Sequence, residues 1–202
     1  MISIFEITDI IGTAAFAISG FLVGTREKLD LFGIFIVSLL TALGGGLVRD
    51  AIVSRPLYSL THVMPITIVL LVFILCIFLR IYRKNGFDQS NLFVIADAIG
   101  LVSFSITGAL IGIDAGLSVY GIIIVALLTA IGGGLIRDML INQFPLILRK
   151  DLYASIALFV GFSVYALNCF NAVNSVNLAI LFIIALFFRL YAYFKKINLP
   201  SL

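Results

Sequence analysis

Ten residues inside one apolar stretch, TALGGGLVRD at positions 41–50, recur almost unchanged as TAIGGGLIRD at positions 129–138. The similarity extends over residues 7–50 and 95–138, which align without a gap and are identical at about 24 of 44 positions. Each copy belongs to a unit of three apolar segments. Because three is odd, the second unit would enter a membrane from the opposite side, which predicts an inverted repeat with functional sites near the midplane.

The composition indicates the environment, water or membrane, in which this repeat folds. Hydrophobic residues make up 62% of the 202 residues and charged residues 11%, with a mean hydropathy of +1.24. A soluble domain is about 45–50% apolar and about 25% charged. We therefore expect an all-α integral membrane protein. The net charge of +3 comes from basic residues scattered over loop-like positions, which does not favour a nucleic-acid partner.

Seven apolar runs are long enough to cross a bilayer, which takes about 20 residues in a helix. They cover residues 4–24, 31–53, 64–82, 92–112, 118–141, 152–170 and 176–194. Their continuous apolar character excludes a membrane β-barrel. The predicted organisation is a first three-helix repeat over 4–84, a second, inverted repeat over 92–170, and a seventh transmembrane helix over 176–194.

The distribution of lysine and arginine predicts the topology. Ten of these residues fall on one side of the predicted spans: Arg26, Lys28, Arg80, Arg83, Lys84, Arg149, Lys150, Arg189, Lys195 and Lys196. The other side has Arg55 and little else, apart from the two arginines within spans. Because basic loops stay in the cytoplasm, we expect the N-terminus outside and the C-terminus in the cytoplasm.

The triple glycines are the first candidate site. They are Gly44, Gly45 and Gly46 in the first repeat, and Gly132, Gly133 and Gly134 in the second. Each glycine costs about 1 kcal/mol relative to alanine inside a helix. Three in succession predict a bend or break that lines a pathway, because unpaired backbone groups are tolerated in a membrane only there or inside the protein. The alternative is close helix packing, which small residues also permit.

Charged residues inside spans form the second candidate site, because they are costly in a membrane and indicate function by default. Asp9 lies about 7–8 Å into the first span and Arg49 about 6 Å from the end of the second, so the two share a depth near the outer face. The repeat places Asp97 and Arg137 at one depth near the inner face. Together with the adjacent aspartates, these residues are candidate charged gates at two mouths: Asp9, Arg49, Asp50, Asp97, Arg137 and Asp138. The alternative is that they anchor helix ends at the interface.

Hydroxyl side chains at helical depth could replace part of an ion's hydration shell. The candidates for the ion pathway are Thr41, Thr129, Ser19 and Thr107. Each could instead bond to a carbonyl of its own helix. His62 is the sole histidine and has no second metal ligand nearby, so no metal site is expected. No nucleophile–base pair or phosphate loop is present, so we expect neither an enzyme nor a cofactor.

The paired GGG-L-[VI]-R-D segments resemble a bacterial membrane family built from two glycine-rich three-helix units, the glycine-transporter domain. Prokaryotic trimeric intracellular cation (TRIC) channels are similar in the same way, and the resemblance covers residues 4–194. It implies a seven-span protomer in a homotrimer, in a bacterial inner membrane. It also implies an hourglass pore in each protomer, with the second and fifth helices bent at the glycines. The animal channels carry a KEV signature and bind phosphoinositide, whereas here the glycines are followed by Leu47 to Asp50 and Leu135 to Asp138.

The leading hypothesis is therefore a monovalent cation channel, selective for potassium, with the permeant cation and membrane lipid as its only expected ligands. A transporter of glycine or another small solute, working by alternating access, is the alternative, since inverted repeats with broken helices suit both. A structural scaffold is a third possibility, and the two charge clusters argue against it.

Overall fold

A computed structural model of the chain describes residues 3–81, 86–145, 152–195 and 197. All regular structure in these residues is helical, which confirms the all-α prediction. The described part holds eight helices: α1 (Ile4–Arg26), α2 (Leu31–Ile52), α3 (Tyr58–Thr61), α4 (Val63–Phe78), α5 (Gly86–Asp114), α6 (Val119–Leu140), α8 (Leu152–Cys169) and α9 (Ser175–Phe194).

The helix count exceeds the expected seven because the connection before α4 forms a helix of its own. This helix, α3, has only four residues. Five helices are long and apolar enough to cross a membrane: α1, α2, the Ser90–Asp114 part of α5, α6 and α9. The remaining two, α4 and α8, are apolar but shorter. Each predicted span overlaps one of the seven longer helices, but some ends differ: α5 spans Gly86–Asp114 where 92–112 was expected, and α4 ends at Phe78.

Equivalent residues start equivalent helices in the two repeats. Asp30 caps α2 by accepting a hydrogen bond from the backbone N–H of Gly33 at 2.7 Å. Ser118 caps α6 by accepting one from the backbone N–H of Gly121 at 3.4 Å. Such a side-chain acceptor satisfies one of the free N–H groups at a helix start. Both helices therefore begin at the same place in the repeat, and their triple glycines lie at the same distance from the helix start.

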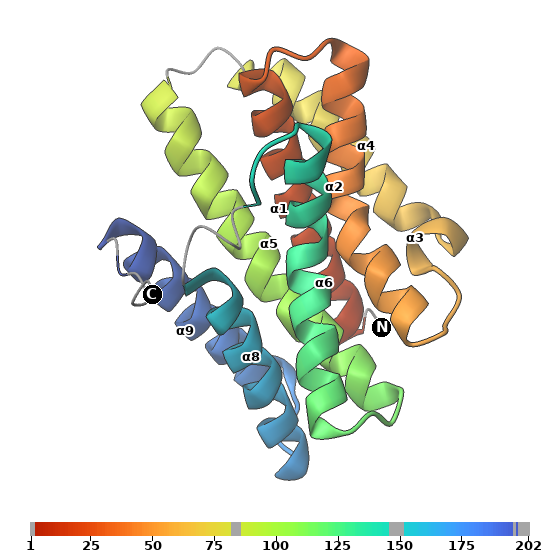
Figure 1. Cartoon of the computed structure of the whole chain (residues 1–202). Helices are drawn as coiled ribbons and strands as arrows, with labels where there is room; N and C mark the ends of the chain where they lie inside the picture. The colour runs from red at the N-terminus through yellow and green to blue at the C-terminus, as the bar shows by residue number, and fades with distance from the viewer. Residues whose placement is uncertain (1–2, 82–85, 146–151, 196, 198–202) are drawn as a thin grey trace.

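Helices α1, α2, α5 and α6 form the centre of the protomer (Figure 1). Within each repeat α1 packs on α2 and α5 on α6, and the two repeats meet through contacts of α1 with α5 and of α2 with α6. The equivalent helices α1 and α5 run in opposite directions, as do α2 and α6 (Figure 1). Helix α4 lies against α1 and α2, whereas α8 packs on α5 and α6, and α9 packs on α5 and α8. The centre is thus built equally from both repeats.

The triple glycines lie where α2 and α6 cross. A Cβ atom built on Gly45 would collide with the carbonyl oxygen of Thr129, and one built on Gly133 would collide with that of Thr41. All six glycines are buried, and both helices continue without interruption through them. Neither helix is broken at its glycines, so a break is the wrong part of the expectation; a bend there, and a pathway lined by the glycines, stay predictions. At these positions the missing side chains let two backbones touch, which is the packing alternative.

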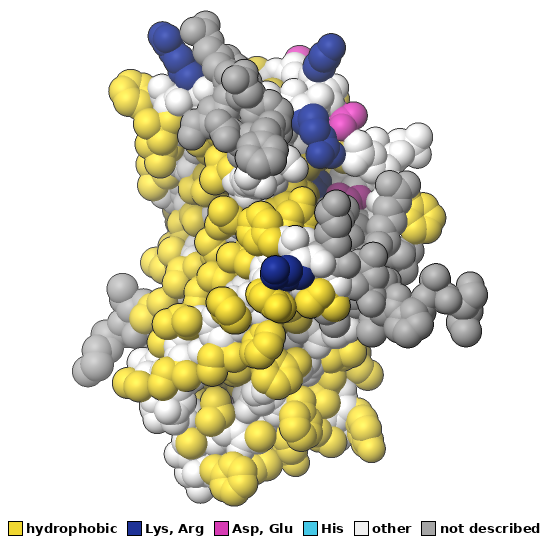
Figure 2. All heavy atoms as spheres, turned by 90° about the vertical axis from the view of Figure 1, so that its left-hand side faces the viewer, with side chains coloured by type: hydrophobic (Ala, Val, Ile, Leu, Met, Phe, Trp, Pro, Cys, Tyr) yellow, Lys and Arg dark blue, Asp and Glu magenta, His cyan; other side chains and the backbone are white. Residues whose placement is uncertain are grey.

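The outer surface suits a lipid environment. Large apolar side chains on α4 and α9 are exposed, for example Phe78 at 81% and Phe187 at 63%. Figure 2 shows apolar side chains over most of one face, with lysine and arginine gathered mainly towards one end. A single soluble domain rarely exposes so much contiguous apolar surface.

One of the ten basic residues assigned to the loops lies elsewhere. Arg189 is in α9, only 5% exposed, with its guanidinium carbon 4.7 Å from the centre of the Tyr153 ring. It is therefore a buried helix residue and adds nothing to the charge of a loop. Five others lie outside the described residues: Arg83, Lys84, Arg149, Lys150 and Lys196.

Candidate functional site

The first charge cluster joins α1 to α2 through Arg49. Its Nη1 donates a hydrogen bond to Asp9 Oδ1 at 3.0 Å, and its Nε donates one to Asp50 Oδ1 at 2.8 Å. The side chain of Arg49 is fully buried. A guanidinium shared between two carboxylates satisfies charges that would be costly alone in a membrane. The predicted pairing of Asp9 with Arg49 is confirmed.

The short helix α3 is attached to the same cluster. The backbone N–H of Tyr58, at its start, donates to Asp50 Oδ2 at 2.8 Å. Arg55 Nε lies 3.4 Å from Asp50 Oδ1. The ring centre of Phe5 lies near both arginines, 5.1 Å from the guanidinium carbon of Arg49 and 5.4 Å from that of Arg55. With two arginines and two aspartates, the first cluster is balanced in charge.

The second cluster repeats this geometry with equivalent atoms. Arg137 Nη1 donates to Asp97 Oδ1 at 2.7 Å, and Arg137 Nε donates to Asp138 Oδ1 at 2.8 Å. The arginine is 1% exposed, and its guanidinium carbon lies 4.9 Å from the centre of the Phe93 ring. The pairing of Asp97 with Arg137 is confirmed as well. Two buried clusters with the same arginine–aspartate pattern therefore lie towards opposite ends of the same four helices.

Hydroxyl groups connect each repeat to the other. Ser19, on α1, accepts a hydrogen bond from Arg137 Nη1 at 2.6 Å, so the first repeat completes the second cluster. Thr107, the equivalent residue on α5, donates to Thr8 of α1 at 3.0 Å. Arg49 Nη2 is buried and has no hydrogen-bond partner in the described part of the chain. The two clusters thus share a pattern but differ in how fully their arginines are bonded.

The two threonines beside the glycines bond to their own helices. Thr41 Oγ1 donates to the carbonyl of Val37 and Thr129 Oγ1 to that of Val125, each at 2.6 Å. Their hydroxyl protons are therefore engaged, while their backbone carbonyls lie against Gly133 and Gly45 of the other repeat. Their role along an ion pathway stays a prediction.

The structure adds partners that the sequence analysis did not single out. Phe5, Arg55 and Tyr58 complete the first cluster, and Phe93 and Tyr153 border the second. Arg55 was noted only as a loop charge. Its distance of five residues from Asp50 across a turn gave no indication that the two side chains meet.

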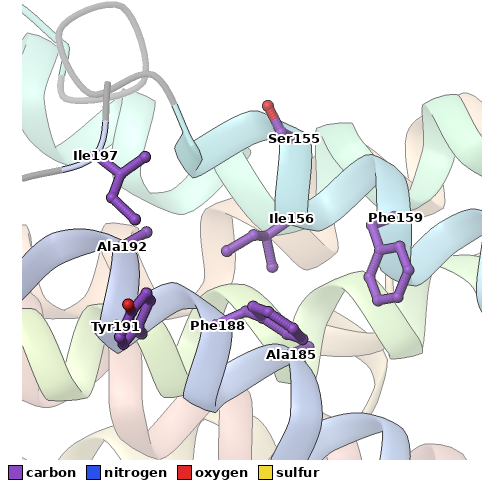
Figure 3. A pocket seen from close by; sticks show the side chains of 8 residues that line it. All are labelled: Ser155, Ile156, Phe159, Ala185, Phe188, Tyr191, Ala192 and Ile197. Atoms are coloured by element: carbon purple, nitrogen blue, oxygen red, sulfur yellow. The ribbon is translucent and has the colours of Figure 1, made fainter. Parts of the chain in front are cut away.

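Two grooves, with volumes of about 400 and 500 Å³, are lined by residues of α8 and α9. The smaller is bordered by Phe159, Phe188 and Tyr191, with Ser155 at its edge (Figure 3). None of the side chains lining these two grooves is charged. No group of three metal-binding side chains comes together among the residues that the structure describes.

An apolar helical exterior, two equivalent three-helix units and buried charge clusters define an integral membrane protein made of an internal duplication. The chain belongs to the family described as Glycine transporter, which matches twice, at residues 6–80 and 94–168. A similar curated protein is UPF0126 membrane protein YvgT of Bacillus subtilis, 34% identical over 97% of this chain and 95% of that protein.

Solved structures of channels are similar over nearly the whole chain. One is reported as the crystal structure of a prokaryotic TRIC channel in 0.5 M KCl, with 30% identity, a TM-score of 0.89 and coverage of 98% of this chain and 100% of the other. Another is the TRIC trimeric intracellular cation channel orthologue from Rhodobacter sphaeroides, with 27% identity, a TM-score of 0.88 and coverage of 96% and 99%. These relatives are membrane proteins and channels, in agreement with the expectation that the chain is not an enzyme.

Proposed function

We propose that this protein is a monovalent cation channel, with potassium as its main permeant ion, in a bacterial inner membrane. The observation that carries the proposal is the pair of equivalent charge clusters, one built on Arg49 and one on Arg137. Both belong to the four central helices, and the chain is similar over its length to a structure described as a channel. Each cluster brings two carboxylates to one mouth of a pathway through the centre.

The carboxylates would act by offsetting the arginine charges, so that a mouth does not repel cations. The first cluster is balanced in charge, whereas Arg137 of the second is bonded to two carboxylates, and this excess of negative charge would attract cations. Between the mouths, the carbonyl and hydroxyl oxygens of Thr41 and Thr129 would replace water around the ion, as oxygen ligands do in other channels. The pathway would narrow towards its middle, as an hourglass, because the two repeats approach each other most closely at the glycines.

The glycine contacts also set what conduction would require. In this structure Gly45 and Gly133 each touch a threonine carbonyl of the other repeat. Helices α2 and α6 must therefore bend or move apart there for an ion to pass. Glycine lowers the cost of such a bend because it is the least favourable ordinary residue for a straight helix apart from proline.

The topology and assembly follow from the same resemblance. We propose seven membrane crossings in two inverted repeats plus α9, with the N-terminus outside and the C-terminus in the cytoplasm. Arg26, Lys28 and Arg80 lie at the described ends that would face the cytoplasm, as the positive-inside rule requires. A homotrimer with one pathway in each protomer is supported by the similarity to a protein described as trimeric.

Membrane lipid would fill the groove between α8 and α9. Its lining is almost entirely apolar, with Phe159 and Phe188 facing the cavity (Figure 3). Such a groove offers an acyl chain surroundings as apolar as those of the bilayer, whereas an unpaired ion there would be costly. Lipid is therefore the ligand that the groove suits, and an ion is not.

Transport of glycine or another small solute is the second candidate. The description of the family favours it, and an inverted repeat can support alternating access. Planar-bilayer recording on the purified protein separates the two functions. Step-like cation currents are expected of a channel, whereas saturable glycine uptake into liposomes without such steps would refute the channel and support the transporter.

A further inference from the structure

Two phenylalanines at equivalent positions of the repeats meet at the centre of the protomer. Phe16 of α1 is fully buried and Phe104 of α5 is 1% exposed. Their ring centroids are 5.3 Å apart and their planes are inclined at 71°. This is an edge-to-face arrangement, which aromatic rings prefer over direct stacking. The contact joins the two repeats directly.

Glycines make room for both rings. A Cβ atom on Gly12 would collide with the ring of Phe104, and one on Gly100 would collide with the ring of Phe16. The rings also touch the triple glycines: a Cβ on Gly45 would lie 3.2 Å from Phe104 Cδ2. On the other side, one on Gly133 would lie 3.4 Å from Phe16 Cδ2. The pair is therefore in contact with all four central helices.

The position of the pair along the helices is intermediate between the two charge clusters. On α1, Phe16 follows Asp9 by seven residues, or roughly 10 Å, and precedes Ser19 by about 4.5 Å. Asp9 belongs to the first cluster and Ser19 is bonded to the second. On α5, Phe104 stands in the same relation to Asp97. A pathway that runs between the four central helices from one cluster to the other would pass the rings, because they touch all four helices at this depth.

We infer that the Phe16–Phe104 pair is a hydrophobic gate at the midpoint of the proposed conduction pathway. This inference rests on the proposed function, because a gate needs a pathway to close. Apolar constrictions stop ions by excluding the water that would accompany them. The gate opens when the two rings separate or rotate together with the movement of α2 and α6 at the glycines.

The test replaces each ring by a smaller apolar side chain, in Phe16→Val, Phe104→Val and the double variant. Phe21→Val is the matched control. Phe21 is also a buried phenylalanine of α1, 2% exposed, and forms an edge-to-face pair with Phe73 at 5.6 Å. That pair lies within the first repeat, so the control removes the same ring volume without altering the contact between repeats.

Loss of one edge-to-face contact should increase the population of the separated state roughly two- to tenfold. Resting cation flux through reconstituted protein should rise by that factor in Phe16→Val and Phe104→Val, and stay near the wild-type value in Phe21→Val. An equal rise in the control would overturn the gate, as would unchanged flux in the double variant. If the valine variants do not assemble, Phe16→Leu and Phe104→Leu repeat the comparison with a smaller loss of volume.

A second measurement detects the water pathway without relying on conduction. Ser19→Cys, in a background with Cys76→Ala and Cys169→Ser, places a thiol beyond the pair. A membrane-impermeant thiol reagent applied on the side of Asp9 should modify this thiol slowly, and several-fold faster when Phe16→Val is added. Equal rates would overturn the gate. If Phe16→Val speeds up modification of the thiol but neither the parent protein nor any variant conducts ions, the gate is upheld and the channel is refuted.

Discussion

The ion pair of Asp9 with Arg49 offers a quantitative test of how the first charge cluster works. The two side chains are 9% and 0% exposed, and their charged atoms are 3.0 Å apart. In Asp9→Asn the amide oxygen can still accept from Arg49, but the bond no longer joins two charged groups, so the loss should not exceed the about 1.5–3 kcal/mol that such a bond contributes. Arg49→Gln should cost more, about 3–5 kcal/mol, because it leaves the buried carboxylate of Asp9 without its bonded cation.

The double variant removes both charges, so its destabilisation should be smaller than the sum of the single effects by about 0.5–3 kcal/mol. Thermal unfolding of the protein in detergent measures the three changes. Arg26 and Glu27 form the control pair, because their charged atoms are 3.6 Å apart and the side chains are 52% and 32% exposed. An exposed pair of this kind couples by about 0–1 kcal/mol.

The same cycle should be visible in cation flux. Asp9→Asn should lower conductance, because Arg49 then repels cations at the mouth. The reduction should be larger at low ionic strength, since the Debye length falls from about 30 Å at 0.01 M salt to about 10 Å at 0.1 M. Adding Arg49→Gln should restore part of the flux. Strictly additive effects on stability and conductance, or a reduction that does not depend on salt, would refute the pairing as a functional unit.

Three further predictions concern packing, hydrogen bonding and assembly. Gly45→Ala and Gly133→Ala should each destabilise the protein by about 1–3 kcal/mol in thermal unfolding, as overpacking does. Gly46→Ala should be tolerated, because its Cβ would meet no described atom closer than 3.4 Å. Equal effects of the three substitutions would contradict the close crossing of α2 and α6. Ser19→Ala removes a hydrogen-bond acceptor from Arg137 and should lower the free energy of unfolding by about 1.5–3 kcal/mol. Thr107→Ala should lower it less, because the Thr107 hydroxyl bonds only to uncharged groups. The reverse order would contradict the role of Ser19 in the second cluster. Native mass spectrometry in mild detergent should detect three chains of 22.0 kDa each, and a stable monomer that conducts would show that trimerisation is dispensable.

The membrane environment and the internal duplication could be predicted from local properties of the sequence. Long apolar runs can satisfy their backbone groups in lipid only as helices, so composition and length predict α1, α2, α5, α6 and α9 directly. The duplicated decapeptide predicts that equivalent elements recur. Pairing of Asp9 with Arg49 was also predictable, because the depth of a residue in a span follows from its distance to the helix end.

The helical continuity at the triple glycines could not be predicted in this way. Propensity alone favours a break at Gly44–Gly46, because each glycine weakens the helix. In the structure, contact with the backbone of the other repeat at Thr129 makes the small residues favourable in a continuous helix. Propensity is a local quantity, whereas this contact joins residues 84 positions apart.

A duplicated, all-helical membrane protein, and the depths of its buried charges, can therefore be predicted from the chain alone, because apolar length and periodic spacing are local properties. How the repeats meet is seen only in the folded molecule: the contact of Phe16 with Phe104, the hydrogen bond of Ser19 to the second cluster, and the contacts of Tyr58 and Arg55 with Asp50. Each of these contacts depends on which faces of two helices come together. That choice is made by packing across the whole bundle, which no single segment specifies.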